Sequence, residues 1–156
     1  MQGGDDERAA MRAMHLRFEQ AVPHNRALGL RVISMEDARA AYLLPYAPHL
    51  VGNPETGVLH GGAISAAMDA ACGAAVFQAL PRPMIIATLD LRIDYLKPAT
   101  PGRDVTIRGH CYKVTRSVAF VRGVAFHDDE ADPIASGAGS FMLGTSSRLR
   151  AAEDGA

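Results

Sequence analysis

The sequence predicts an α+β fold in which an antiparallel sheet curls around one long central helix. The run from Gly61 to Leu80 is almost entirely apolar or small, which is typical of a buried helix. After this run the period switches, and apolar residues alternate with charged ones, the period of a strand with one buried face. The length of 156 residues suits one domain with one hydrophobic core.

The first half of the chain is expected to contain a helix, two strands and a loop. A short N-terminal helix is predicted over Asp5–Ala21, where good helix formers have partial apolar spacing, and Pro23 ends it. Two short strands are predicted over Leu30–Met35 and Ala40–Pro45. The segment Pro45–Gly57 is rich in proline and glycine and is expected to be a loop that leads into the long helix.

The second half is expected to consist of strands. Apolar residues alternate with charged ones after the helix, so Leu89, Leu91, Ile93 and Tyr95 are expected on one buried face. Short breaks between the later segments predict antiparallel neighbours and a meander of four strands. The remaining three strands are predicted over Val105–Val114, Ser117–His127 and Ile134–Gly144.

The expected domain organisation is simple. Residues 1–22 form an N-terminal helical segment, 23–145 the domain and 146–156 a frayed, polar tail. A helix that is apolar all round needs cover on every side, and one curled sheet covers only one side. The simplest expectation is that a second copy of the chain packs against the other side of the helix.

The composition excludes several classes of function. Apolar residues make up 48% and charged residues 21%, and the net charge of -1 creates no field that attracts nucleic acid or anionic lipid. Cys72 and Cys111 are far apart and are expected to be free thiols. The histidines have no metal-ligand spacing, so no metal site is predicted. The start of the chain is acidic and has no apolar signal segment, which favours a soluble, cytoplasmic protein.

The triplet His60-Gly61-Gly62 stands where the long helix begins after a loop. The first N–H groups of a helix have no intrahelical partner, and the helix dipole adds positive charge there. Glycine allows close backbone approach, so this start suits an oxyanion or a polarised carbonyl oxygen. A plain helix start, in which the glycines only make the turn, is the alternative.

Asp69 is the only charged residue between Glu55 and Arg82. An unpaired carboxylate inside an apolar helix is costly, so it needs either a partner or a function. One interpretation is a buried carboxylate satisfied by a neighbouring serine, such as Ser65 four residues earlier, or by a backbone group. The other is a nucleophile or general base, which an isolated carboxylate in apolar surroundings favours.

Gly61 and Asp69 are eight residues apart in the predicted helix. At ~1.5 Å per residue they are separated by about 12 Å, too far for both to act on one carbonyl carbon. If they share a site, two chains must cooperate. Antiparallel packing of two such helices would create two equivalent sites across a twofold axis.

The pattern NPETGVLHGGAISAAMD, followed by TLDLRIDYLKPA, resembles the hotdog-fold acyl-CoA thioesterases of the phenylacetyl-CoA thioesterase-like (PaaI) group. The resemblance extends from about Phe18 to Leu143. It implies hydrolysis of an acyl-CoA, with an aryl or a medium to long acyl group, to the free acid and CoA. It also implies a homodimer with shared active sites, often paired into a homotetramer, and no cofactor beyond the coenzyme A of the substrate.

The same resemblance implies the roles of individual residues. The Gly61 N–H would polarise the thioester carbonyl, and Asp69 of the partner chain would act as nucleophile or general base. His60 would fix the loop and the amide before the helix. Asn53 would assist at the carbonyl or the water, and Thr88 would hold the water or Asp69. The positions that would contact coenzyme A are Tyr95, Lys97, Pro98, Lys113, Arg116 and Ser117.

Two other functions are compatible with the sequence. A hotdog-fold enoyl-CoA hydratase or dehydratase would use a histidine near an acid, but His60 is nine residues from Asp69. A non-catalytic acyl-CoA binding protein would have no need of the lone Asp69. Seryl and cysteinyl nucleophiles are less favoured, because no G-x-S-x-G elbow is present and nothing in the sequence activates Cys72.

Overall fold

A computed structural model describes residues 13, 17 and 19–144 of the chain. Most of the predicted Asp5–Ala21 helix and the whole 146–156 tail lie outside these residues. The first complete element is the short helix α2 (Pro23–Leu28). Pro23 therefore begins a helix, which its fixed φ and missing N–H suit at the first helical position.

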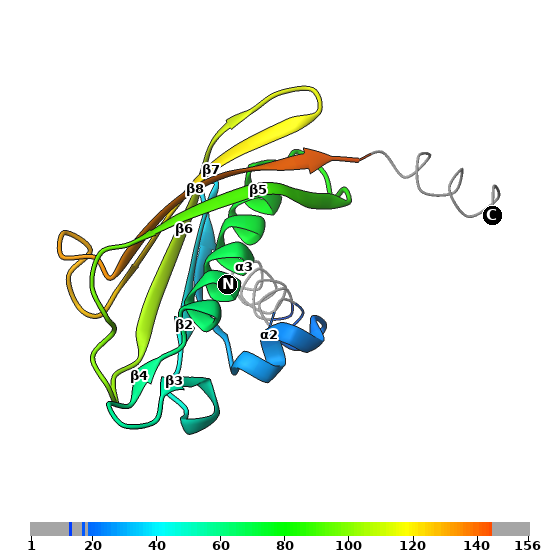
Figure 1. Cartoon of the computed structure of the whole chain (residues 1–156). Coiled ribbons are helices and arrows are strands. Elements are labelled where there is room, and N and C mark those ends of the chain that lie inside the picture. The colour runs from blue at the N-terminus through cyan, green and yellow to red at the C-terminus, as the bar shows by residue number, and fades with distance from the viewer. Residues whose placement is uncertain (1–12, 14–16, 18, 145–156) are drawn as a thin grey trace, which may run out of the picture.

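The predicted architecture is confirmed: a curled antiparallel sheet packs around the long helix α3 (Gly61–Ala79), as Figure 1 shows. The strand order is β1-β2-β6-β7-β8-β5, and every neighbouring pair is antiparallel. The strands are β1 (Arg31–Glu36), β2 (Arg39–Leu44), β5 (Ile86–Tyr95), β6 (Val105–Val114), β7 (Val118–Phe126) and β8 (Ala135–Leu143).

The predicted meander is correct for β6, β7 and β8 but wrong for β5. Strand β5 pairs with β8 at the edge of the sheet and not with its sequence neighbour β6. The connection over 96–104 contains Pro98, Pro101 and Gly102, and it carries the chain across the sheet instead of forming a hairpin. Strand β5 is thus an edge strand, and its outer backbone edge has no neighbour among the described strands.

The predicted buried face of β5 is only half correct. The register shifts between Thr88 and Asp90, so Leu89 lies in a bulge and its exposed fraction is 56%. Leu91 and Ile93 pack against the core, whereas Tyr95 at the end of the strand is 49% exposed. The bulge reverses the alternation, and it turns Thr88 to the helix side of the sheet.

The segment predicted as a loop contains local structure. A short 3₁₀ helix (Pro48–Leu50) leads into a small hairpin of β3 (Val51–Asn53) and β4 (Val58–Leu59). The turn between the two strands uses Gly57 at φ 75°, a conformation that glycine adopts without strain. This hairpin fixes the chain immediately before α3.

Helix α3 packs closely on the sheet. A Cβ added at Gly109 of β6 would lie 2.6 Å from the Ala71 carbonyl oxygen, and one at Gly123 of β7 would lie 2.3 Å from the Met68 sulfur. Small residues on both elements therefore allow close contact, and Ala67, Met68 and Ala71 are fully buried. α3 is the one helix in the described chain with the length and composition of a membrane span, and here it is the core helix.

The opposite side of α3 remains partly open, as expected for a sheet that covers only one side. Its partly exposed residues are Ser65, Ala66, Asp69, Ala70 and Gly73. These positions form one stripe along the helix, which faces away from the fully buried residues.

Candidate active site

The start of α3 is capped by its own histidine. His60 is the N-cap residue, and its Nδ1 accepts a hydrogen bond from the Gly62 N–H at 2.8 Å. The Ala63 N–H donates to the His60 carbonyl oxygen at 3.0 Å. A Cβ at Gly62 would lie 2.8 Å from His60 Nδ1, so glycine is needed for this close cap.

The Gly61 N–H is left free by this arrangement. It has no hydrogen-bond acceptor among residues 13, 17 and 19–144, although the amides of Gly62 and Ala63 are both occupied. This N–H lies at the positive end of the helix dipole, where a developing oxyanion is stabilised. The geometry therefore offers one specific donor for a carbonyl oxygen.

The Gly61 carbonyl, in contrast, is fully engaged. It accepts from the Tyr95 hydroxyl at 2.6 Å and from the Ser65 hydroxyl at 3.1 Å, and these two hydroxyls are 2.5 Å apart. The Tyr95 ring lies against the Gly61 backbone, because a Cβ at this position would be 3.3 Å from it. This role of Ser65 was not predicted from the sequence, although a serine four residues after Gly61 can reach back to its carbonyl.

Asp69 has a hydrogen-bond partner, but it is not Ser65. The Thr88 hydroxyl of β5 donates to Asp69 Oδ1 at 2.7 Å. The interpretation of Asp69 as a carboxylate satisfied by Ser65 is therefore wrong, because Ser65 is turned to Gly61 and Tyr95. Asp69 lies on the partly exposed stripe of α3 and is accessible from outside the single chain.

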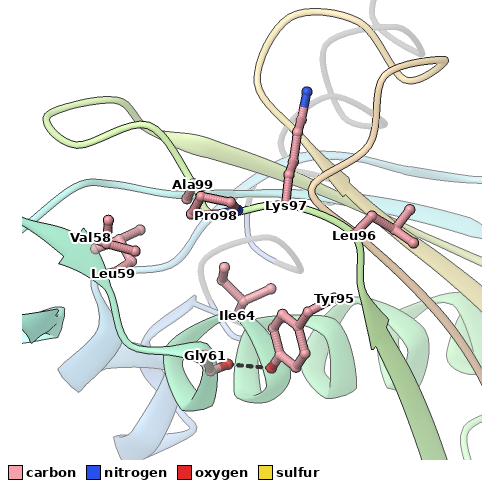
Figure 2. A pocket seen from close by; sticks show the side chains of 9 residues that line it. All are labelled: Val58, Leu59, Gly61, Ile64, Tyr95, Leu96, Lys97, Pro98 and Ala99. Atoms are coloured by element: carbon pink, nitrogen blue, oxygen red, sulfur yellow. Dashed lines mark hydrogen bonds between the residues drawn. The ribbon is translucent and has the colours of Figure 1, made fainter.

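A pocket of about 330 Å³ opens beside Gly61, and Figure 2 shows its lining. Most of its walls are apolar, and Lys97 stands at its rim with its ammonium group pointing away from Gly61. Asp69 of the same chain does not line it. The lining residues are Val58, Leu59, Gly61, Ile64, Tyr95, Leu96, Lys97, Pro98 and Ala99.

Asn53 lies in β3, next to the helix start. A Cβ at the preceding Gly52 would be 2.8 Å from the His60 Cα, so β3 passes directly over the N-cap. The Asn53 side-chain oxygen accepts from the Glu55 N–H at 3.0 Å, and its carbonyl accepts from the Gly57 N–H at 2.8 Å. Asn53 thus organises the β3–β4 turn in the single chain.

The predicted coenzyme A residues fall into two groups. Tyr95, Lys97 and Pro98 lie at the pocket, where Lys97 forms an ion pair with Asp132. Lys113 lies near the end of β6, Arg116 and Ser117 lie in the β6–β7 turn, and all three are exposed. The Ser117 carbonyl accepts from the Leu143 N–H at 2.8 Å, and Leu143 pairs with the start of β5.

These two groups lie at opposite ends of the sheet. The β6–β7 turn is at the end of β5 that carries Thr88, whereas Tyr95 and the pocket are at the other end. Thr88 and Tyr95 pair with Phe141 and Ala135 of β8, which are six strand positions apart, or about 20 Å. Within one chain, Gly61, Tyr95 and Lys97 therefore form one half-site, and Asp69, Thr88 and the β6–β7 turn form another.

Cys72 is not a reactive thiol. It is fully buried on α3, and burial, followed by the nearby Asp69 carboxylate and Cys111, raises its pKa to about 12. Both cysteines are free. Among the described residues, no three His, Cys, Asp or Glu side chains come together as a metal-ligand group.

The profile of the thioesterase superfamily matches residues 56–134, which include the helix start and Asp69. The chain belongs to the thioesterase superfamily. The expected hotdog-fold thioesterase and the hydrolase class are thereby confirmed.

Relatives of this thioesterase have similar lengths. It is 34% identical to the medium/long-chain acyl-CoA thioesterase YigI of Salmonella typhimurium and to that of Escherichia coli K12, over 81% of this chain and 89% of each relative. It is 47% identical to a Pseudomonas aeruginosa protein of known crystal structure, with a TM-score of 0.74 over 81% of this chain and 93% of the other. The phenylacetic acid degradation protein PaaI of Thermus thermophilus shares the fold (24% identity, TM-score 0.67, 78% and 98% coverage).

Proposed function

We propose that this thioesterase hydrolyses acyl-CoA thioesters at sites shared between two chains, with Gly61 from one chain and Asp69 from the other. The single observation that supports this most is the separation of the two half-sites. The free amide and the apolar pocket stand at one end of the sheet, and the carboxylate and its threonine stand toward the other. Neither half-site contains all the groups that the reaction needs.

The proposed chemistry follows from these groups. The Gly61 N–H donates to the thioester carbonyl oxygen and stabilises the negative charge that develops there. Asp69 of the second chain either attacks the carbonyl carbon or takes a proton from the attacking water. The carbon–sulfur bond then breaks, and CoA leaves as the thiol after it takes up a proton. If Asp69 is the nucleophile, this leaves an acyl–Asp69 anhydride, which water hydrolyses to the free acid and the original carboxylate; if Asp69 is the base, water has added to the carbonyl carbon and the acid is released directly. Hydrolysis by this route uses only water and protein groups, without a metal or a further cofactor.

Coenzyme A would be held by both chains. Tyr95, Lys97 and Pro98 border the pocket of the chain that supplies Gly61, and Lys113, Arg116 and Ser117 would come from the chain that supplies Asp69. Basic side chains at strand ends and turns suit the phosphates of CoA. The names of the YigI relatives favour a medium or long acyl chain over an aryl group, and the apolar walls of the pocket would accept either.

The β5 edge is the expected dimer contact. It has unpaired backbone groups and exposes Ile85, Leu89 and Leu96, with exposed fractions of 51%, 56% and 57%. Pairing of two β5 strands about a twofold axis would cover these side chains and would bring the open stripes of two α3 helices together. We propose a homodimer that pairs again into a homotetramer, located in the cytoplasm.

Mixed dimers test the shared site directly. Gly61→Pro removes the amide hydrogen but suits the first position of a helix, and the extended His60 (φ -64°, ψ 132°) is compatible with a following proline. Asp69→Asn removes the carboxylate charge with little change in shape. Each homodimer should lose at least about 100-fold in kcat on a medium-chain acyl-CoA.

Co-refolded Gly61→Pro and Asp69→Asn chains should regain activity, because one site of each mixed dimer then has both wild-type groups. Recovery should approach a quarter of the wild-type rate, since about half of randomly paired dimers are mixed and each has one intact site. If the mixture stays as inactive as its components, the site lies within one chain. A wild-type protein that binds acyl-CoAs of every length but releases no thiol would instead be a binding protein.

A further inference from the structure

We infer that the hydroxyls of Tyr95 and Ser65 position the Gly61 amide for catalysis. This inference rests on the proposed thioesterase function. It assigns the Tyr95 hydroxyl to the protein's own backbone and not to coenzyme A. The observation behind it is the triangle of oxygens formed by the Gly61 carbonyl, the Tyr95 hydroxyl and the Ser65 hydroxyl, with contacts of 2.6, 3.1 and 2.5 Å (the first is drawn in Figure 2).

The backbone around Gly61 needs this support. Two consecutive glycines have more conformational freedom than any other dipeptide, and a catalytic donor is effective only when its direction is fixed in advance. The Gly61–Gly62 peptide is held at both ends: His60 Nδ1 accepts its N–H, and the two hydroxyls bond its carbonyl. The preceding peptide is held through the His60 carbonyl, which accepts from Ala63 N–H.

This arrangement leaves a single backbone group available. Every polar group of these two peptides is engaged except the Gly61 N–H, which is left free for a substrate. Tyr95 also limits what can stand at position 61, because its ring would be 3.3 Å from any added Cβ. Tyr95 thus connects the end of the edge strand β5 to the start of α3.

The number of hydroxyl protons limits how Tyr95 and Ser65 can hydrogen-bond to the Gly61 carbonyl. Three oxygen contacts are available but only two hydroxyl protons, so two of the three contacts are hydrogen bonds at one time. In one arrangement Tyr95 donates to the Gly61 carbonyl and Ser65 donates to Tyr95. In another, Ser65 donates to the carbonyl and Tyr95 donates to Ser65. In a third, both hydroxyls donate to the carbonyl. In every arrangement at least one hydroxyl proton reaches the carbonyl, so either residue can substitute for the other.

The test is a double-mutant cycle. Tyr95→Phe keeps the ring and removes the hydroxyl, and we expect kcat to fall about 5-fold, the value of one ordinary hydrogen bond. Ser65→Ala should have a smaller effect, because the shorter Tyr95 contact remains. The double variant should lose at least about 30-fold, more than the product of the single losses, because neither substitute is left.

A matched control is Tyr112→Phe, since Tyr112 lies on β6 with its ring against Arg122 and away from the pocket. It should keep wild-type kcat. Free CoA, measured as a competitive inhibitor, separates the two roles of Tyr95. A positioning role leaves the CoA inhibition constant of Tyr95→Phe unchanged, and a CoA contact would raise it with kcat intact. The latter result, or wild-type kcat in the double variant, overturns the inference.

Amide hydrogen exchange provides a readout that does not need turnover. The Gly62 N–H should exchange faster in the double variant than in the wild type, with an unchanged melting temperature. Equal exchange would overturn the positioning role. A wild type that cleaves no thioester would refute the proposed function, and the exchange result would still decide how the Gly61–Gly62 peptide is held.

Discussion

The Thr88 hydroxyl donates a hydrogen bond of 2.7 Å to the Asp69 carboxylate, joining the edge strand to the middle of the core helix. This contact holds one oxygen of the carboxylate, and Asp69 lies on the partly exposed side of α3. A base or nucleophile that acts on a substrate from a second chain needs this orientation. Thr88 therefore has a defined task in the proposed reaction.

Thr88→Val should lower kcat about 10-fold without a change in KM, because a hydrogen bond to a charged group is lost while the shape is kept. Thr88→Ser keeps the hydroxyl and should restore most of the rate. Steady-state kinetics on one acyl-CoA are sufficient for the comparison. Equal kcat in the valine and serine variants would show that the hydroxyl does not matter.

Comparing Gly61→Pro with Gly61→Ala separates the effect of losing the amide hydrogen from the effect of adding a side chain. Both add a Cβ, which would lie 3.3 Å from the Tyr95 ring, but only proline removes the N–H. We expect kcat of the proline variant to be at least about 100-fold below that of the alanine variant, the usual effect of one oxyanion donor. Circular dichroism should show equal helix content. Similar rates for the two variants would argue that the Gly61 N–H is not the donor.

Cys72 should be inert in the native protein. Its pKa of about 12 leaves almost no thiolate at neutral pH, and the side chain is fully buried. Iodoacetamide should therefore label it only after denaturation, which mass spectrometry of the Cys72 peptide would measure. Rapid labelling of the native protein, with loss of activity, would point to a thiol mechanism.

His110 should make the fold less stable in acid. Partial burial, and then the charges of Arg39 and Arg122 on the neighbouring strands, lower its pKa from its ordinary value of 6.5. The unfolded chain then binds more protons than the native one below this value, so stability falls as the pH drops through 6.5.

Replacing His110 by glutamine tests this directly. The melting temperature of the variant should fall less than that of the wild type between neutral pH and pH values below 6.5. Parallel melting curves for the two proteins across this range would exclude the effect.

Local patterns were sufficient for much of the fold. The long helix was predicted within one residue of α3, because its apolar composition and the prolines after it are properties of neighbouring residues. Strands β6, β7 and β8 were also predicted, because their residue patterns and the short breaks between them are local features. The pairing of β5 was not, because a strand chooses its partner through packing between distant segments.

The candidate site was likewise predictable in part: the sequence indicated the two reactive groups but not all of their hydrogen-bond partners. Gly61 and Asp69 stand in the sequence as a glycine at a helix start and a lone carboxylate, and their spacing of about 12 Å follows from helix geometry alone. The tertiary structure decided their partners. The Ser65 hydroxyl contacts Tyr95 and Gly61, although its position four residues before Asp69 suggested a hydrogen bond with Asp69.

The sequence by itself determined the helix, the place where it begins and the distance between the two reactive groups, since these depend on residues within a few turns of each other. The pattern of the residues left open which hydroxyl reaches Asp69; the family resemblance implied that Thr88 would hold the water or Asp69, and the tertiary structure shows the contact with Asp69. Strict alternation along β5 would have placed Thr88 on the outer face with Asp90 and Arg92. A single bulge at Leu89 turned it inward, and such a register shift is set by the fit of β5 on β8 and α3, which no local pattern encodes.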